Sequence, residues 1–297
     1  MSAASGLGLD APSAPAAHRV HGPSALSGDL RRFCSLTFTL ARTEFKLRFF
    51  GSVLGYLWTL VRPLLLFGVL WVFFTKVAHV NSSTNPGERF YGVQLLGSIV
   101  LFTFFAEATG AAVRSVVDRE NLVRKIHFPR LVIPASVVLL AVFNLVLNLI
   151  VVLIFALGSG VTPMLSWLEL PLIIGAIVVL AAGVAMLLSA LFVHFRDIQP
   201  IWEVVSQILF YASPVIISIE TVHAKLSHTL FHLYMLNPLA VVFQQFRHAM
   251  VTHGTLSAGQ ALGSWTALLE PAAIVGAIFI IGFAVFSGAA AKIAENL

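Results

Sequence analysis

One short stretch of this sequence concentrates charge between two stretches that carry almost none. Residues 114–134 read RSVVDRENLVRKIHFPRLVIP, with five cations and two carboxylates between Arg114 and Arg130. Mixed charges around apolar positions at helical spacing are suited to binding a groove on another protein. The alternative is a solvated loop whose cations only orient the chain, but that role needs no helical pattern and no acids. The residues expected to form the docking helix are Arg114, Asp118, Arg119, Glu120, Leu122, Arg124, Lys125 and Ile126.

A second group of residues places polar side chains inside apolar stretches. Asn144 and Asn148 are four residues apart, and so are Gln207 and Tyr211. Each pair therefore shares one face of a helix. Hydrogen bonding between neighbouring helices explains such pairs as well as a polar path through the protein does. Arg62 stands near the start of an apolar stretch, where it either reaches the headgroup region or meets an anionic group.

Several kinds of chemistry are absent from the sequence. There is no GxxxxGK[ST] motif, and no Gly is followed by Lys, so the chain has no P-loop for nucleotide phosphates. It also has no HExxH and no CxxC, and Cys34 is its only cysteine. His228 and His232 have the spacing of metal ligands, but no acid or thiol accompanies them. We therefore expect no catalytic site, no metal and no cofactor in this chain.

The composition is that of an integral membrane protein. Hydrophobic residues make up 58% of the chain and charged residues 10%, whereas a soluble domain has about a quarter charged residues. The net charge of +5 does not indicate nucleic acid as a partner, because the cations gather in a few segments. A spanning helix needs about 20 mostly apolar residues. Six stretches qualify, at about 57–76, 92–112, 131–157, 170–193, 200–219 and 269–290.

The distribution of positive charge predicts the orientation. Fourteen of the 18 Lys and Arg lie before or just inside the first apolar stretch, between the second and third, between the fourth and fifth, or after the last. The positive-inside rule then places both termini in the cytoplasm. Residues 1–28 are rich in Ala, Pro, Ser and Gly, and we expect a disordered cytoplasmic tail there.

Two further segments are expected to lie at the membrane surfaces. Residues 29–50 form an amphipathic pattern typical of an interfacial helix, although Glu44 and Arg48 interrupt its apolar face. Residues 220–268 are too polar to span, and they predict two short re-entrant helices that are broken at Asn237-Pro238. The expected fold is an all-α integral membrane domain with six transmembrane helices.

Four segments, in their order and spacing, resemble the permeases of type-2 ABC exporters, and in particular the Wzm-type branch that moves lipid-linked polysaccharides. They are EFKLRFFGSVLGYLWTLVRPLL at 44–66, RENLVRKIHFPRLVIP at 119–134, HFRDIQPIWEVVSQILFYASPVI at 194–216 and LNPLAVVFQQFRHAM at 236–250. The resemblance covers residues 29–290, and the long Ala/Pro-rich N-terminus is a departure from the family pattern. The Ala- and Val-rich composition is typical of an actinobacterial protein, and the resemblance then suggests the mycobacterial galactan precursor as the cargo, beside O-antigen and teichoic-acid types.

The resemblance implies an assembly and a role for each segment. It implies a homodimeric permease in the plasma (inner) membrane, without enzymatic activity, that pairs with a Wzt-like nucleotide-binding subunit holding ATP and Mg. Residues 114–130 would be the ATPase-coupling segment and residues 220–268 the outside gate. A sugar ring has a C–H face and a rim of hydroxyls, so its path needs flat rings and hydrogen-bonding groups. The expected path residues are Tyr56, Trp58, Arg62, Phe105, Asn144, Asn148, Gln207 and Tyr211.

Other functions are open on the sequence alone. The aromatic residues could instead form a lipid-facing belt, and a closed apolar pocket would favour an ABC permease for small amphipathic compounds. A secondary transporter is disfavoured because Glu107, Glu203 and Glu270 lie near the ends of apolar stretches rather than at mid-membrane. A structural membrane scaffold is the fourth alternative. Co-purification of an ATPase subunit would separate the two ABC permeases from the last two classes.

Overall fold

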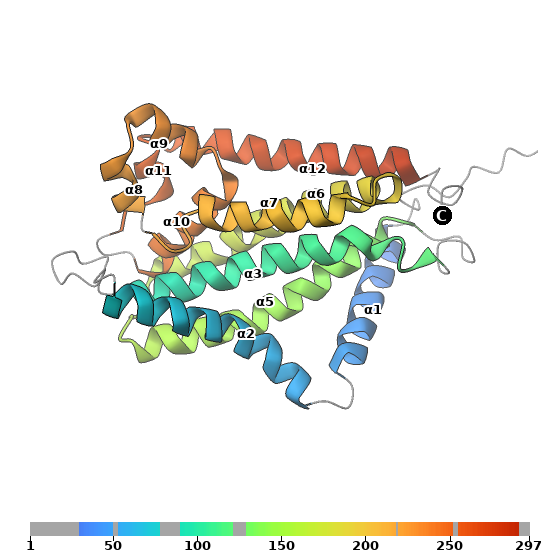
Figure 1. The fold of residues 1–297 in the computed structure, drawn as a ribbon, viewed down its shortest axis with the longest axis horizontal. Helices are drawn as coiled ribbons and strands as arrows, with labels where there is room; N and C mark the ends of the chain where they lie inside the picture. The colour runs from blue at the N-terminus through green and yellow to red at the C-terminus, as the bar shows by residue number, and fades with distance from the viewer. Residues whose placement is uncertain are drawn as a thin grey trace, which may run out of the picture.

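The computed structural model of the chain describes residues 30–49, 53–77, 90–120, 129–217, 219–251 and 255–290. Every regular element in these ranges is a helix, as the apolar stretches predicted (Figure 1). The longer helices are α1 (Leu30–Phe49), α2 (Val53–Val72), α3 (Tyr91–Ser115), α5 (Val132–Gly158), α6 (Leu170–His194), α7 (Ile198–Ala212) and α12 (Leu269–Ala290). The shorter ones are α8 (Ile219–Lys225), α9 (His228–Met235), α10 (Pro238–Met250) and α11 (Ala258–Ala261).

Among the described residues, five helical segments are long and apolar enough to cross a membrane. They are Leu57–Val77, Tyr91–Ser115, Val132–Gly158, Leu165–His194 and Thr266–Ala289. The first extends α2 through a π-helical turn, Phe73–Val77, and the last two include short 3₁₀ turns before α6 and α12. These segments correspond to the first, second, third, fourth and sixth expected spans.

The fifth expected span, 200–219, is a shorter helix than the sequence predicted. It corresponds to α7, which has 15 residues and ends at Ala212. At 1.5 Å per residue it measures about 22 Å, less than the hydrocarbon core of about 30 Å. The helix stops because Pro214 disfavours the helical conformation of the residue before it, and Ser213 is accordingly extended at φ −107° and ψ 155°. A sixth complete span therefore stays a prediction.

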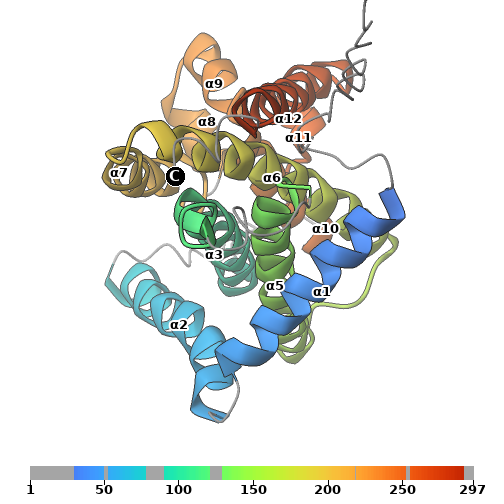
Figure 2. The same cartoon turned by 90° about the vertical axis from the view of Figure 1, so that its right-hand side faces the viewer.

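Helix α3 lies at the centre of the bundle. In its most apolar stretch 72% of the residues are buried, against 11% in the spans that contain α2 and α12, so these two helices lie at the periphery. Figure 2 looks along the bundle and shows α5 and α6 beside α3, with α2 and α12 further out. The main core joins Leu95 and Phe105 of α3 to Leu145 of α5, Ile177 of α6 and Phe243 of α10.

The last helix, α12, meets α6 where two glycines cross. A Cβ atom added at Gly282 would lie 2.1 Å from the carbonyl oxygen of Gly183. One added at Gly183 would lie 2.7 Å from the Cα atom of Phe279. Both distances are far below an ordinary carbon contact, so the two backbones touch directly. Close backbone contact through small residues is a main source of packing energy between helices in lipid.

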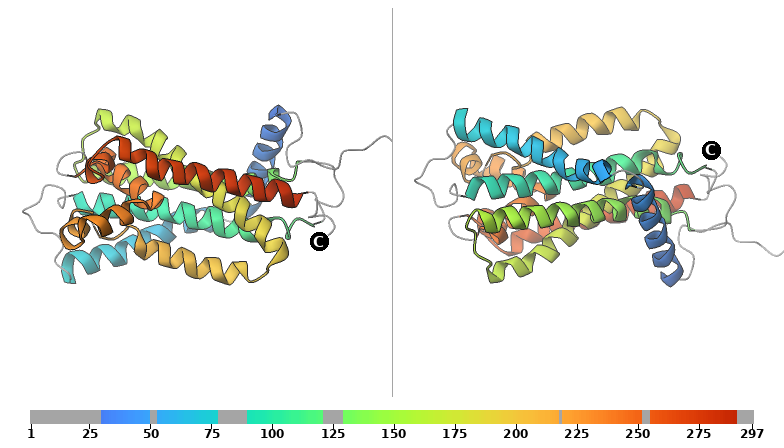
Figure 3. Two further views of the ribbon diagram at one scale, coloured as in Figure 1. Left: turned by 90° about the horizontal axis from the view of Figure 1, so that it is seen from above. Right: turned by 90° about the horizontal axis from the view of Figure 1, so that it is seen from below.

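The two ends of the bundle differ. Helix α1 lies across one end rather than along the bundle, as Figure 3 shows. The last turn of α3, the start of α5 and the last turn of α12 share that end, while α8–α11 gather at the other (Figure 1). The basic residues in the last turns of α1 and α3 therefore lie at the same end of the bundle. Which side of a membrane this end faces stays a prediction, as does the interfacial position of α1.

The segment 220–268 was predicted to form two short helices, but the structure describes four there, α8 to α11, the first of which begins at Ile219. Its expected break is confirmed, because α9 ends at Met235 and α10 begins at Pro238. Asn237 caps α10 by accepting a hydrogen bond from the amide of Leu239 at 3.1 Å. Phe231 and Met235 bury their side chains against Ile219 of α8. Re-entry into the membrane stays a prediction, and the tail expected at 1–28 lies outside the described residues.

Candidate translocation surface and coupling segment

Helix α7 turns one face to α3 and the opposite face outward. Trp202 donates from Nε1 to Oγ1 of Thr109 on α3 at 3.1 Å, and the ring of Phe210 meets that of Phe102 edge-on at 5.0 Å between centroids. At 3.6 residues per turn, Gln207 and Tyr211 fall on the side away from Trp202. Both side chains are exposed, Tyr211 at 69%.

Helix α2 is divided in the same way. Phe67 is buried, and its ring lies 5.3 Å from that of Phe155 on α5 in an edge-on contact. Trp58 and Arg62 lie on the opposite side of the helix. Both are exposed, Trp58 at 61%. Tyr56 belongs to α2, but its side chain is outside what the structure describes.

The helices α2 and α7 both lie on one side of α3 in the views of Figures 2 and 3. We define the α2–α7 surface as Trp58 and Arg62 on α2 with Gln207 and Tyr211 on α7. Exposed aliphatic side chains surround them, namely Leu65, Val69, Ile201, Val204 and Ile208. The surface thus offers two aromatic rings, an amide and a guanidinium. Rings bind apolar C–H faces, and the polar groups bind hydroxyls and phosphate oxygens.

Three of the other expected path residues lie in the core. Phe105 is 2% exposed and packs against Trp202, with ring centroids 6.2 Å apart. Asn144 is 3% exposed and donates from Nδ2 to Oε1 of Glu107 at 2.8 Å. Asn148 donates to the carbonyl oxygen of Asn144 at 2.9 Å. Of the two explanations for the asparagine pair, the structure favours hydrogen bonding within the bundle.

Glu107 is a polar centre that sequence reasoning did not assign to a site. Its Oε1 accepts hydrogen bonds from Asn144 on α5 and from Nη1 of Arg48 on α1, both at 2.8 Å. The carboxylate therefore joins α1, α3 and α5. A carboxylate within an apolar helix is costly unless it is paired, and here a cation and an amide stabilise its charge.

A second ion pair joins α1 to the end of the expected coupling segment. Glu44 of α1 accepts a hydrogen bond from Arg119. Arg119 also contacts the start of α5, where it donates to Oγ of Ser136 at 3.3 Å and to the carbonyl oxygen of Ile133 at 3.4 Å. Glu44 and Arg48 stand one turn apart, and the interrupted apolar face of residues 29–50 was the sequence signal for both pairs.

The coupling segment is described only at its two ends. Arg114 and Asp118 are exposed, whereas Arg119 and Glu120 are partly buried. The remaining expected docking residues lie outside the described residues; they are Leu122, Arg124, Lys125 and Ile126. Docking of a partner on this segment therefore stays a prediction. Just before α5, Arg130 is buried, and desolvation lowers the pKa of its guanidinium.

Arg247 on α10 fixes the chain that leaves α7. It is 2% exposed and donates to the carbonyl oxygens of Val215 at 2.8 Å and Ile217 at 3.2 Å, and to Oγ of Ser98 on α3 at 3.2 Å. The hydroxyl of Tyr91 donates to the intervening carbonyl of Ile216 at 2.9 Å. The sequence showed Arg247 only as one of the few cations outside the cation-rich segments, so this role was missed.

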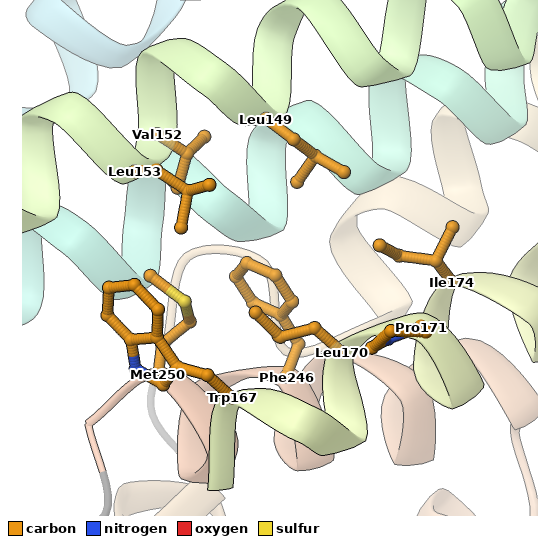
Figure 4. A pocket seen from close by; sticks show the side chains of 9 residues that line it. All are labelled: Leu149, Val152, Leu153, Trp167, Leu170, Pro171, Ile174, Phe246 and Met250. Carbon is orange, nitrogen blue, oxygen red and sulfur yellow. The ribbon is translucent and has the colours of Figure 1, made fainter. Parts of the chain in front are cut away.

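An apolar pocket of about 260 Å³ lies between α5, the start of α6 and α10. Figure 4 shows the side chains that line it: Leu149, Val152, Leu153, Trp167, Leu170, Pro171, Ile174, Phe246 and Met250. Apart from the indole of Trp167, the lining has no hydrogen-bonding side chain. None of these residues belongs to α2 or α7, so the pocket is separate from the α2–α7 surface.

The histidines expected as weak candidates for metal binding do not form a metal site among the described residues. No group of three or more His, Cys, Asp or Glu side chains gathers there. His232 instead approaches Glu270 at the start of α12, with Nε2 and Oε2 3.6 Å apart.

Comparison with known proteins identifies relatives over most of the chain. The profile of a family described as ABC-2 type transporter matches residues 35–251. The O-antigen export system permease protein RfbA of Myxococcus xanthus is 28% identical over 225 residues, which cover 76% of this chain and 84% of the relative. Two proteins of the same name from Klebsiella pneumoniae are 28% identical over 223 residues and 26% identical over 263 residues. They cover 75% and 88% of this chain, and 82% and 95% of their own lengths.

Proposed function

This chain belongs to the ABC-2 type transporter family, and we propose that it is the permease subunit of an ATP-driven exporter for a lipid-linked polysaccharide. The observation that carries the proposal is its similarity, over at least three quarters of its length, to three permeases named for O-antigen export. The bundle of apolar helices supports a multi-pass membrane protein. The plasma (inner) membrane is its proposed location.

The energy for export is proposed to come from a separate subunit. The sequence contains no P-loop, so ATP and Mg²⁺ would be bound by a Wzt-like nucleotide-binding partner. The coupling segment around residues 114–130 is the proposed docking site for that partner. The described residues of this segment lie at the same end of the bundle as α1 and the last turn of α12 (Figure 1).

The path for the polymer is proposed to run along the α2–α7 surface. This surface has rings and hydrogen-bonding groups on helices at the edge of the bundle, and a second copy of the chain would enclose it. We therefore propose a homodimer with one shared path, because a symmetric conduit of this kind needs two copies. The buried residues Phe105, Asn144 and Asn148 would support the path from behind rather than line it in the conformation seen here.

The cargo is proposed to be a polymer of the galactan, O-antigen or teichoic-acid type. Arg62 would meet the pyrophosphate of the lipid carrier, and the rings of Trp58 and Tyr211 would contact sugar rings. The apolar pocket at α5, α6 and α10 is the feature that favours the alternative, an exporter of small amphipathic compounds. None of its lining residues belongs to α2 or α7, so the pocket is not part of the proposed polymer path.

The proposal is tested by deleting the gene for this chain in its host. The expected result is loss of one surface polysaccharide, with its lipid-linked precursor accumulating inside the cell. Tagged wild-type chain should restore the polymer and should purify with an ATPase subunit, two copies of each by native mass. Unchanged surface polysaccharide combined with increased sensitivity to hydrophobic drugs would support the alternative instead.

A further inference from the structure

We propose that Glu44 and Arg48 are positioning residues that make α1 a strut between the coupling segment and α2. The inference rests on the proposed function and extends it to the route by which the ATPase would act on the path. It starts from a conflict in the sequence. An interfacial helix needs an apolar face toward the membrane core, yet two charged residues stand on that face.

The structure resolves this conflict, because both charges meet partners on the bundle. Glu44 pairs with Arg119 at the end of the coupling segment, and Arg48 pairs with Glu107 at 2.8 Å. Residues 44 and 48 are separated by one helical turn, and their partners are twelve residues apart in the chain. The two ion pairs therefore hold α1 at two levels of the bundle and fix both its position and its angle.

Each partner is itself held by α5. Arg119 donates to Oγ of Ser136, and Glu107 accepts from Nδ2 of Asn144. The Glu44–Arg119 pair is the more buried, with side chains 24% and 15% exposed. Partial burial reduces screening of this pair by water, whereas Arg48 is half exposed and its pair is weaker. We therefore assign the larger share of the positioning to Glu44.

The chain connects this strut directly to the proposed path. Helix α1 ends at Phe49, and α2 begins at Val53. Trp58 and Arg62 on the α2–α7 surface follow within three turns of the α2 start. A displacement of Arg119 would thus move Glu44, then α1, then the start of α2. A helix that only rested on the headgroups would transmit no such displacement and would need no charges on its inner face.

The experiment compares E44R, R119E and the reversed pair E44R/R119E in the exporter assembled with its ATPase. R42Q is the matched control, because Arg42 is exposed on α1 two residues from Glu44. Each variant is measured for export, for ATP hydrolysis and for co-purification of the ATPase. We expect E44R to lower export about tenfold while hydrolysis and assembly persist. Arg119 also belongs to the expected docking helix, so rescue by the reversed pair is judged from the position of α1 rather than from export.

A second measurement reports the strut without the partner. Cys34 is the only cysteine of the sequence and lies exposed on α1, so a spin label there reports the mobility of this helix. In the purified chain, E44R should increase that mobility, and the reversed pair should restore it. R42Q should leave it unchanged.

The outcomes separate the strut from the proposed function. Normal export by E44R would overturn the inference while the exporter assignment stands. Unchanged label mobility in E44R would also overturn it, because α1 would then be held by something else. If the wild-type chain exports no polysaccharide, the proposed function fails, whereas a mobile label in E44R would still establish the strut as a structural connection.

Discussion

The guanidinium of Arg247 on α10 donates to the carbonyl oxygen of Val215 at 2.8 Å, just beyond the end of α7. A buried cation thus binds the backbone just after Pro214, where α7 has ended. The contact joins residues 32 positions apart and determines where α7 leaves the bundle. It also makes Arg247 the most consequential cation in the part of the segment 220–268 that the structure describes.

Replacing Arg247 with methionine should destabilise the protein strongly. The change leaves the carbonyls of Val215 and Ile217 and the hydroxyl of Ser98 without this donor, and each buried polar group without a partner costs about 1–3 kcal/mol. R247K should be intermediate, because one ammonium cannot match the geometry of the guanidinium. Thermal unfolding in detergent measures the effect, with K225M as the control at an exposed cation. Equal melting temperatures for R247M and K225M would contradict the role of Arg247.

The crossing of α6 and α12 predicts a sharp difference between two glycines of one helix. Gly282→Ala should cost about 1–3 kcal/mol, because its Cβ would lie 2.1 Å from a backbone oxygen of Gly183. Gly276→Ala meets nothing within 4 Å and should be neutral or stabilising by up to about 1 kcal/mol, since alanine favours helix. Yield of folded protein and melting temperature compare the two. A stable G282A variant would show that α12 packs elsewhere.

Exposed and buried path candidates should respond differently to truncation. The double variant Q207A/Y211A should slow polymer export several-fold and leave the melting temperature unchanged, because neither side chain packs in the core. Asn144→Ala should instead lower the melting temperature, because it removes a hydrogen bond to Glu107. Surface polysaccharide, basal ATP hydrolysis and thermal unfolding are measured together. Normal export by Q207A/Y211A would assign these residues to the lipid-facing belt.

Reversing charges in the coupling segment should impair assembly with the ATPase without affecting insertion of the permease into the membrane. R124E/K125E is expected to abolish export and to lower co-purification of the ATPase, because the proposed docking depends on the charges that this segment presents to its partner. Membrane insertion should be unaffected, since several other cations remain in the same segments. R114E serves as a comparison at the other end of the segment. Normal assembly and export by the double variant would place the docking site elsewhere.

The protein should lose stability at high pH through Tyr234. Burial raises the pKa of this phenol from its ordinary value of 10 to about 12, and the nearby charge of Arg247 opposes only part of that rise. The neutral phenol is thus favoured in the folded state, so its stabilising contribution is complete below pH 10 and is lost as the pH rises toward 12. Tyr234→Phe should flatten the pH dependence of unfolding in this interval. An unaltered alkaline transition in that variant would assign the loss to another group.

Much of the bundle was predictable from the sequence, because spanning helices need only length and apolar composition. Five expected spans agree with helices of the structure, and the break at Asn237-Pro238 was correctly located. The predicted length of the fifth span was wrong, because the apolar composition continues past Pro214 whereas the helix ends at Ala212. Helical spacing could not distinguish the outward Tyr211 from the inward Phe105, since which face is buried depends on neighbours far away in the chain.

The polar contacts were harder to foresee than the helices. Glu107 with Arg48, and Arg119 with Glu44, lie 59 and 75 positions apart, and periodicity within one segment cannot reveal such partners. Their only local trace was the pair of charges on an apolar face. An interruption of that kind in an otherwise regular pattern is therefore worth interpreting as a contact rather than as noise.

The position of α12 has a consequence for how the protein is made. The buried side chains of the main core all come from residues 67–251, and α12 adds only partly buried residues such as Val275 and Ile278. Helix α12 follows the other described helices in the chain, so the ribosome releases it after them. The main core can therefore close before α12 is inserted, and α12 then places Gly282 against Gly183 and buries Phe286 in a second cluster with Ile133 and Met186. Among the described helices, α12 would then be the one that docks onto a core already formed by the others.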